Sequence, residues 1–108
     1  RVVGTVLRSV VLLLLFGGTA YGAELYLSWT DNSSDETRFE VERGSTPDGS
    51  FSNVATLAAG VTTYRDSNLV ADTQYCYRIR ACNDAGCSSY SPVTCQRATQ
   101  LPGSDEFK

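Results

Sequence analysis

Four cysteines have the clearest potential for chemistry in this sequence. Cys76, Cys82, Cys87 and Cys95 make an even number in a chain of 108 residues. In a short exported protein, an even set of cysteines predicts disulfide bonds. A zinc site would need closely spaced Cys-x-x-Cys pairs or histidines, and the sequence contains neither. We therefore expect all four cysteines to form disulfides, with no metal ion and no other cofactor.

The sequence lacks the residue combinations of common hydrolases. A nucleophilic Ser or Cys needs a base, most often histidine, and the chain has none. Glycosidases need two carboxylates that face each other across a cleft, whereas Glu40 and Glu42 are two residues apart on an expected strand and indicate a solvated face. The net charge is −3 and the arginines are scattered among acids, so there is no basic stripe for nucleic acid. We expect neither an enzyme nor a nucleic-acid-binding protein.

The polar segment after Thr30 has some features of a calcium-binding loop. Asp31, Ser33, Asp35 and Glu42 occupy positions 1, 3, 5 and 12 of such a loop. Position 6 is Glu36 where the loop needs glycine, and no helical pattern flanks the segment. These departures favour an ordinary polar turn over a calcium site.

Two further features concern carbohydrate. Asn32-Ser33-Ser34 is an acceptor triplet for N-linked glycosylation on an expected exposed loop. Aromatic residues that could form a sugar-binding strip are also present, although strand positions explain most of them equally well. The members of this strip would be Tyr21, Tyr26, Tyr64 and Tyr90.

Short strands separated by turns must position all of these groups. Alternation of apolar and polar residues over residues 24–98 predicts strands at 25–30, 38–43, 54–57, 62–65, 75–83 and 87–94. The apolar phase of these strands predicts one core that contains Trp29, Phe39, Val41, Tyr77 and Ile79. The opposite phase makes Cys76, Arg78, Arg80 and Cys82 face outward. We expect an all-β antiparallel sandwich at residues 24–98 and a tail or linker at residues 99–108.

Residues 1–23 differ from the rest of the chain. Arg1 and Arg8 precede the apolar run Val10-Val11-Leu12-Leu13-Leu14-Leu15-Phe16, and small residues follow it. This layout is typical of a secretory signal peptide cleaved before Ala23. The run is shorter than the roughly 20 residues of a membrane span. If the segment is retained in the mature protein, it must be buried against something, and we expect other copies of the chain to cover it.

The ordered residues of the middle region resemble the fibronectin type III family. Residues 27–32 and 39–43 are similar to the second and third strands of that family. Leu69, Thr73 and Tyr75 resemble its tyrosine corner, and residues 77–81 continue like the strand that follows. Residues 83–86, with Ser88 and Ser91, are similar to its last hairpin. The resemblance implies an immunoglobulin-like sandwich, but cleavage before Ala23 would leave the chain without the family's first strand.

The last two strands of this resemblance determine which cysteines pair. A hairpin that turns at residues 84–86 places Cys82 opposite Cys87. Counting outward along the two strands, Cys76 falls opposite Val93, which is one same-face step short of Cys95. A bulge closes that step. We therefore expect the nested bridges Cys82–Cys87 and Cys76–Cys95.

Two functions fit these observations. The first is a structural subunit of an extracellular homopolymer, such as a filament or surface appendage, in which the apolar segment from Val10 to Phe16 packs against other copies of the chain. The alternative is a secreted or cell-surface binding or spacer module with a cleaved signal peptide and a protein or glycan ligand. In both cases we expect an extracellular location, with membrane contact only during export.

Overall fold

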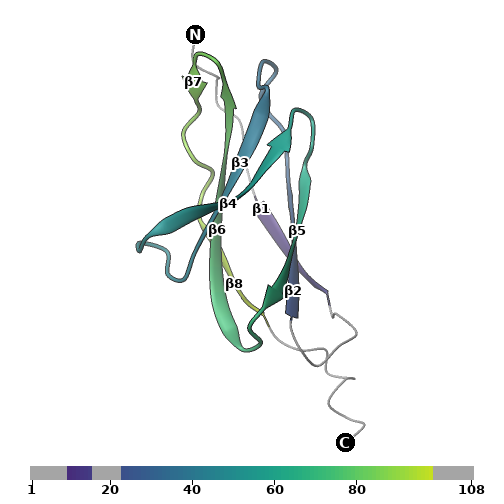
Figure 1. Cartoon of the computed structure of the whole chain (residues 1–108), viewed down its shortest axis with the longest axis vertical. Helices are drawn as coiled ribbons and strands as arrows, with labels where there is room; N and C mark the ends of the chain where they lie inside the picture. The colour runs from purple at the N-terminus through teal and green to yellow at the C-terminus, as the bar shows by residue number, and fades with distance from the viewer. Residues whose placement is uncertain (1–9, 16–22, 99–108) are drawn as a thin grey trace, which may run out of the picture.

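The computed structural model describes residues 10–15 and 23–98, with the backbone alone for residues 10–15. Within these residues, the chain forms two antiparallel β-sheets that face each other (Figure 1). The smaller sheet has the strand order β1 (Val10–Leu15), β2 (Ala23–Trp29) and β5 (Thr63–Leu69). No helix in this part of the chain is long and apolar enough to cross a membrane. The expected all-β antiparallel sandwich is confirmed.

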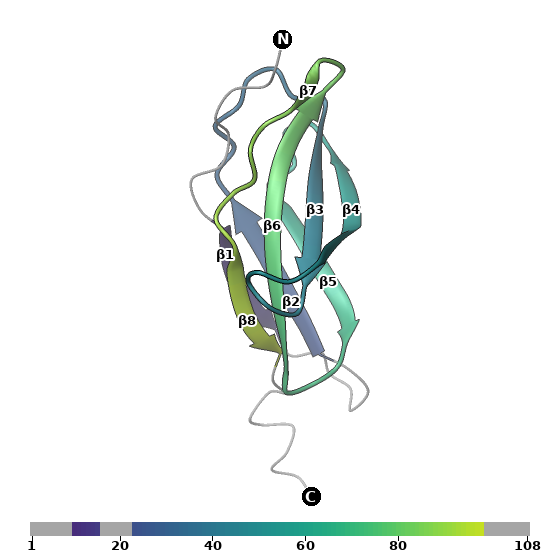
Figure 2. The same cartoon turned by 90° about the vertical axis from the view of Figure 1, so that its left-hand side faces the viewer.

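The larger sheet is built around the long strand β6. Its order is β4 (Phe51–Ala58), β3 (Arg38–Gly44) and β6 (Thr73–Asn83), and β6 then pairs with both β7 (Gly86–Cys87) and β8 (Thr94–Ala98). Strand β8 contacts β1 of the smaller sheet, and the two lie side by side along one side of the sandwich (Figure 2). The connection between β4 and β5 carries the chain from the larger sheet to the smaller one.

Inward-facing apolar side chains from both sheets form one core. The five residues expected there are buried: Trp29, Phe39, Val41, Tyr77 and Ile79. The rings of Trp29 and Phe39 meet edge to face, with their centroids 5.9 Å apart. This arrangement suits the electrostatics of two aromatic rings and links the two sheets directly. Alternation within each strand therefore predicted the core correctly.

The tyrosine corner expected from the family resemblance is present. The backbone N–H of Val70 donates a hydrogen bond to the hydroxyl of Tyr75 at 2.9 Å, so that this side chain closes the turn that precedes its own strand. Leu69 is buried beside this turn, and the ring of Tyr75 packs against the core. Gly86, the first residue of β7, has a φ of 144°, a conformation that glycine adopts without steric cost.

The strand expected at residues 87–94 is interrupted. Strand β7 ends at Cys87 and β8 begins at Thr94, so residues 88–93 lie outside the regular ladder. Two buried serines replace the missing strand contacts. Ser88 Oγ accepts a hydrogen bond from the N–H of Ala81 at 3.1 Å, and Ser91 Oγ accepts one from the N–H of Ile79 at 3.0 Å. These bonds satisfy buried backbone donors that would otherwise be costly.

Within the single chain, the apolar run pairs with a strand of its own domain. The backbone of β1 pairs antiparallel with β2 of its own domain, from Val10 opposite Trp29 to Leu15 opposite Glu24. This is the edge position that the family resemblance assigns to a first strand, which would be absent only after cleavage before Ala23. Three parts of the chain lie outside the described residues, namely residues 1–9, residues 16–22 and the tail at residues 99–108. They include Phe16 and the residues just before the expected cleavage point at Ala23. Packing of the segment against other copies stays a prediction.

Candidate interaction surface

Two disulfides mark the two ends of the outer face of β6. Cys76 is bonded to Cys95, and Cys82 is bonded to Cys87. These are the pairs expected from the hairpin, and Cys76 lies directly opposite Cys95 in the register. A regular hairpin that pairs Cys82 with Cys87 would place Val93 opposite Cys76. The structure places Cys95 there, two residues further along, which is the same-face step that the sequence required. The irregular residues 88–93 absorb it.

Two of these cysteines face outward and are nevertheless buried. Cys76 and Cys82 alternate with the core residues of β6 and so lie on the outer face, yet both are fully buried. A residue on a central strand has a neighbouring strand on each side, and here each sulfur is also covered by its disulfide partner on the adjacent strand. The expected outward direction is therefore confirmed, and the burial comes from the neighbouring strands and the disulfide partners.

Arg78 and Arg80 lie between the two disulfides and pair with the acids of β3. Register places Glu42 opposite Arg78 and Glu40 opposite Arg80. Arg78 Nε donates to Glu42 Oε1 at 2.9 Å, and Arg80 Nε donates to Glu40 Oε1 at 2.9 Å. Arg38 Nε also donates to Glu40, at 3.1 Å. The acidic row expected to be solvated is therefore half-buried beneath guanidinium groups.

Tyr90, carried by the irregular segment between the disulfides, covers both arginines. The guanidinium carbon of Arg78 lies 3.9 Å from the centroid of the Tyr90 ring, and that of Arg80 lies 4.7 Å away. Phe51 of β4 also contacts Arg78, with its ring centroid 4.4 Å from the guanidinium carbon. The hydroxyl of Tyr90 donates to Glu42 Oε2 at 3.0 Å. Each aromatic ring thus holds a cation over its face, which is a favourable arrangement.

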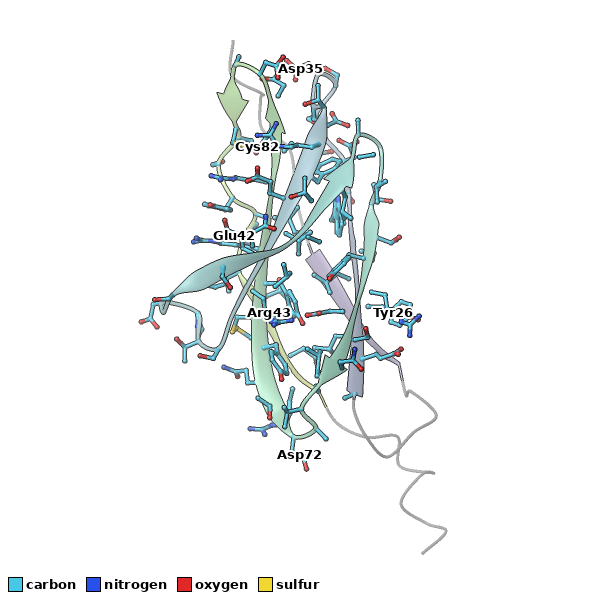
Figure 3. All side chains as sticks on the ribbon, viewed as in Figure 1. Tyr26, Asp35, Glu42, Arg43, Asp72 and Cys82 are labelled. Carbon is cyan, nitrogen blue, oxygen red and sulfur yellow. A yellow bond between two sulfur atoms is a disulfide. The ribbon has the colours of Figure 1, made fainter. Side chains whose placement is uncertain are left out.

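We call this set the arginine–tyrosine surface; it consists of Arg38, Glu40, Glu42, Phe51, Arg78, Arg80 and Tyr90. Burial alone would raise the pKa of the Glu40 carboxyl, but hydrogen bonds from Arg80 and Arg38 outweigh it and lower that pKa. Burial, together with the hydrogen bond to Glu42, raises the pKa of Tyr90. At neutral pH the Glu40 carboxylate is therefore charged, and the hydroxyl of Tyr90 is neutral. In Figure 3, Glu42 lies on the larger sheet, near the middle of the molecule.

The candidate metal-binding groups do not form an ion site among the described residues. Asp31 Oδ1 accepts hydrogen bonds from Ser33, whereas Glu42 pairs with Arg78 on β6, so the calcium-loop residues are not brought together. Glu40 lies close to the sulfurs of Cys82 and Cys87. Those two sulfurs are joined in a disulfide, so neither is a thiolate that could bind a metal.

The tyrosines of the expected sugar-binding strip do not share one surface. Tyr26 lies on the outer side of the smaller sheet, between the core residues Leu25 and Leu27, and projects away from the larger sheet in Figure 3. Tyr64 packs against the core and directs its hydroxyl to the carbonyl of Val54 at 3.4 Å. Tyr90 covers the larger sheet, and Tyr21 lies outside the described residues. The strip is therefore not formed by its described members.

The sequence did not reveal a buried polar cluster between the sheets. Asp66 of β5 is only 4% exposed and accepts hydrogen bonds from Arg43 Nη1 at 2.8 and 3.0 Å. Tyr77 of β6 donates its hydroxyl to Asp66 Oδ2 at 2.6 Å. In Figure 3, the labelled Arg43 points from the larger sheet towards the smaller one. The only available signal was an acid directly after the strand expected at residues 62–65, and an acid in such a position usually indicates exposure to solvent.

Comparisons with known proteins agree with this architecture. The family model "Fibronectin type III domain" matches residues 19–97. Among solved structures, the chicken CNTN1 FN1–FN3 domains share 12% identity with a TM-score of 0.72, over 92% of this chain and 33% of that chain. The titin kinase with its flanking domains shares 26% identity with a TM-score of 0.67, over 86% of this chain and 16% of that one.

A bacterial enzyme also contains a similar domain. Pectate lyase PelI from Erwinia chrysanthemi, solved with tetragalacturonic acid, shares 22% identity with a TM-score of 0.65, over 82% of this chain and 28% of that one. In these three structures, the present chain spans a third or less of the longer chain. No curated protein sequence matches the chain.

Proposed function

The chain belongs to the fibronectin type III family, a family of modules in extracellular and surface proteins, and on this premise we propose that it is an exported binding and spacer module. Two disulfides are consistent with an extracellular domain. Domains of this fold are typically not catalytic, and we propose recognition of a protein partner through the arginine–tyrosine surface. The pre-organised stack of Tyr90 on Arg78 and Arg80 is the observation that supports this function.

The chemistry of this surface suits binding to another protein. Tyrosine and arginine are enriched among the residues that contribute most to protein interfaces. The side chains of Arg78 and Arg80 are 29% and 30% exposed, so part of each guanidinium still faces solvent. An arginine has five N–H donors, and each of these two uses only some of them for its glutamate. The remaining donors suit carbonyl or carboxylate oxygens of a partner.

Rigidity adds to this argument. Both disulfides are on the same face as the two arginines and enclose the segment that carries Tyr90. A binding group that is already held in place loses less conformational entropy when the partner arrives. The surface therefore needs little rearrangement to bind.

The charge of the surface also suits an acidic partner, because its three guanidinium groups outnumber its two carboxylates.

A binding assay with single substitutions tests this function. The purified domain would be immobilised, and exported proteins of the source organism that it retains would be identified and tested one by one. We expect Tyr90→Ala to raise the dissociation constant at least about 10-fold, because truncating a central anchor typically costs about 2 kcal/mol or more. Tyr26→Ala is the matched control on the other sheet and should leave the affinity unchanged. Equal affinity of the wild type and Tyr90→Ala would reject this surface.

A homopolymer assembled through Val10–Phe16 is the second proposal. Its support is a run of seven apolar residues, six of which form the edge strand β1. Exchange of an edge strand between copies would preserve the backbone hydrogen bonds made to β2 while joining two molecules. Sedimentation of the full chain over a range of concentrations tests this idea. Oligomers that disappear when residues 10–16 are deleted would support it, and a monomeric full chain would reject it.

The N-terminal residue of the exported protein separates the two proposals. Cleavage before Ala23 would remove β1 together with any assembly through it, which leaves the binding module. Retention of Val10–Phe16 would keep strand exchange available. N-terminal sequencing of protein collected outside the cell gives this answer directly.

A further inference from the structure

The loop of residues 30–37 carries the acceptor triplet Asn32-Ser33-Ser34, which the arginine–tyrosine surface does not use. The sequence has three other asparagines, and none is followed two positions later by Ser or Thr. These are Asn53, Asn68 and Asn83. Asn32 is thus the single position in this sequence with the pattern that directs N-linked glycosylation.

The loop geometry exposes the two residues that the modification requires. Asp31 Oδ1 accepts a hydrogen bond from the backbone N–H of Ser33 at 3.0 Å. The Ser33 hydroxyl has one proton, which Asp31 Oδ1 and Glu36 Oε1 share as acceptors. The other carboxylate oxygen of Glu36 accepts the N–H of Gly60 at 3.2 Å. Asn32 and Ser34, on either side of Ser33, are exposed. Asp31, Ser33 and Glu36 therefore hold the loop together, and Asn32 and Ser34 stay exposed.

The side chain of Asn32 is available for modification. It takes part in no hydrogen bond or ion pair with any residue in the described part of the chain. A substituent on its amide nitrogen would break no hydrogen bond or ion pair among the described residues. Among the residues that the structure describes, Asp31, Ser33 and Glu36 close the loop instead. Asn83 Nδ2 also donates a hydrogen bond to the carbonyl of Asp35 at 3.0 Å.

We propose that Asn32 is an N-glycosylation site, modified by an oligosaccharyltransferase of the export pathway. The co-substrate is an oligosaccharide linked to a polyprenyl diphosphate. The amide nitrogen of Asn32 forms a bond to the anomeric carbon of the first sugar. The bond from that carbon to the diphosphate oxygen breaks, and the diphosphate leaves with the electron pair. The nitrogen loses one proton to a base of the transferase, and no oxidant or reductant is involved.

The position of the loop makes this modification compatible with partner binding. In Figure 3, Asp35 of the same loop lies at one end of the molecule, whereas Glu42 of the arginine–tyrosine surface lies towards its middle. A flexible glycan on Asn32 would project from the end of the sandwich. The glycan would shield the loop at that end, and the outer face around Glu42 would stay accessible to a partner.

Secretion from cultured mammalian cells tests the proposal. The full chain would be expressed behind a heterologous leader, because this leader provides export whether or not the proposed function is correct. We expect an increase in mass that peptide-N-glycosidase F removes, leaving aspartate in place of Asn32 in the tryptic peptide. A failure here concerns Asn32 alone, whereas failure of the binding assay concerns the surface around Tyr90.

Three substitutions separate the acceptor triplet from general effects on the loop. Asn32→Gln and Ser34→Ala should each abolish the mass increase. Ser33→Ala disrupts the hydrogen bonds of the loop but keeps the triplet intact, so it should still be glycosylated. Secreted, disulfide-bonded wild type with an unmodified Asn32 would overturn the proposal, as would a glycan that persists in Asn32→Gln.

Discussion

The hydroxyl of Tyr77 donates a hydrogen bond to Asp66 Oδ2 at 2.6 Å, and this bond joins the two sheets inside the sandwich. Tyr77 is fully buried in β6, and Asp66 comes from β5 of the opposite sheet. Arg43 provides the positive charge that balances the carboxylate. Burial and the hydrogen bond to Asp66 raise the pKa of Tyr77, so its hydroxyl stays protonated and able to donate.

Removing the acid of this cluster should destabilise the fold strongly. Asp66→Ala leaves the buried hydroxyl of Tyr77 without its acceptor and Arg43 without its counter-charge, so we expect a loss of about 2–4 kcal/mol. Tyr77→Phe removes only the hydroxyl and should cost less than Asp66→Ala. Unfolding in urea measures both. Asp48→Ala, at an exposed turn, is the matched control and should change the free energy of unfolding by less than about 0.5 kcal/mol.

The serines of the interrupted strand should contribute more to stability than their size suggests. Ser88→Ala and Ser91→Ala each leave a buried backbone N–H without an acceptor, at Ala81 and Ile79 respectively, and we expect a cost of about 1–3 kcal/mol for each. Amide hydrogen exchange should quicken at those two positions. Ser89→Ala alters the exposed serine of the same segment and should have no such effect. Unchanged exchange at Ala81 in Ser88→Ala would contradict the assigned role.

The two disulfides should contribute unequally to stability. They close rings with sequence separations of 5 and 19 residues. The loop-entropy relation gives about 2 kcal/mol for the Cys82–Cys87 ring and about 3 kcal/mol for the Cys76–Cys95 ring. Paired Cys→Ser variants, followed by thermal unfolding, should therefore show the larger fall in Tm for Cys76→Ser with Cys95→Ser. Equal falls in Tm would mean that ring length in the unfolded chain does not determine how much each disulfide contributes.

Acid should weaken the contribution of Glu40. Because its folded-state pKa is lowered from the ordinary 4.5, its ion pairs stabilise the fold above that pH, and this stability is lost as the pH falls through the folded pKa. The difference in unfolding free energy between wild type and Glu40→Gln should be largest near pH 7. It should shrink below about pH 4.5, where the wild-type carboxyl also takes up a proton. A difference that does not change between pH 7 and pH 3 would disprove the assignment.

The sequence alone determined the sandwich, its core and the Cys82–Cys87 pair, because each follows from a local period. The Cys76–Cys95 pair needed one further assumption, a bulge between the two disulfides. Alternation with a period of two assigns Tyr77 and Ile79 to one face of a strand and Arg78 to the other. Counting along a hairpin places Cys82 opposite Cys87. These inferences need only the residues of one strand or of two adjacent strands, and the chain order supplies both.

Only the tertiary structure decided which distant side chains meet. Tyr90 lies over Arg78 because residues 88–93 leave the regular ladder, and no period predicts where an irregular segment lies. Asp66 is buried because Arg43 and Tyr77 of the opposite sheet reach it, and a single strand carries no information about the sheet that packs against it. The backbone of β1 pairs with β2, although the same apolar run is also typical of a signal peptide. Composition specifies the need for burial, whereas the packed fold specifies the partner.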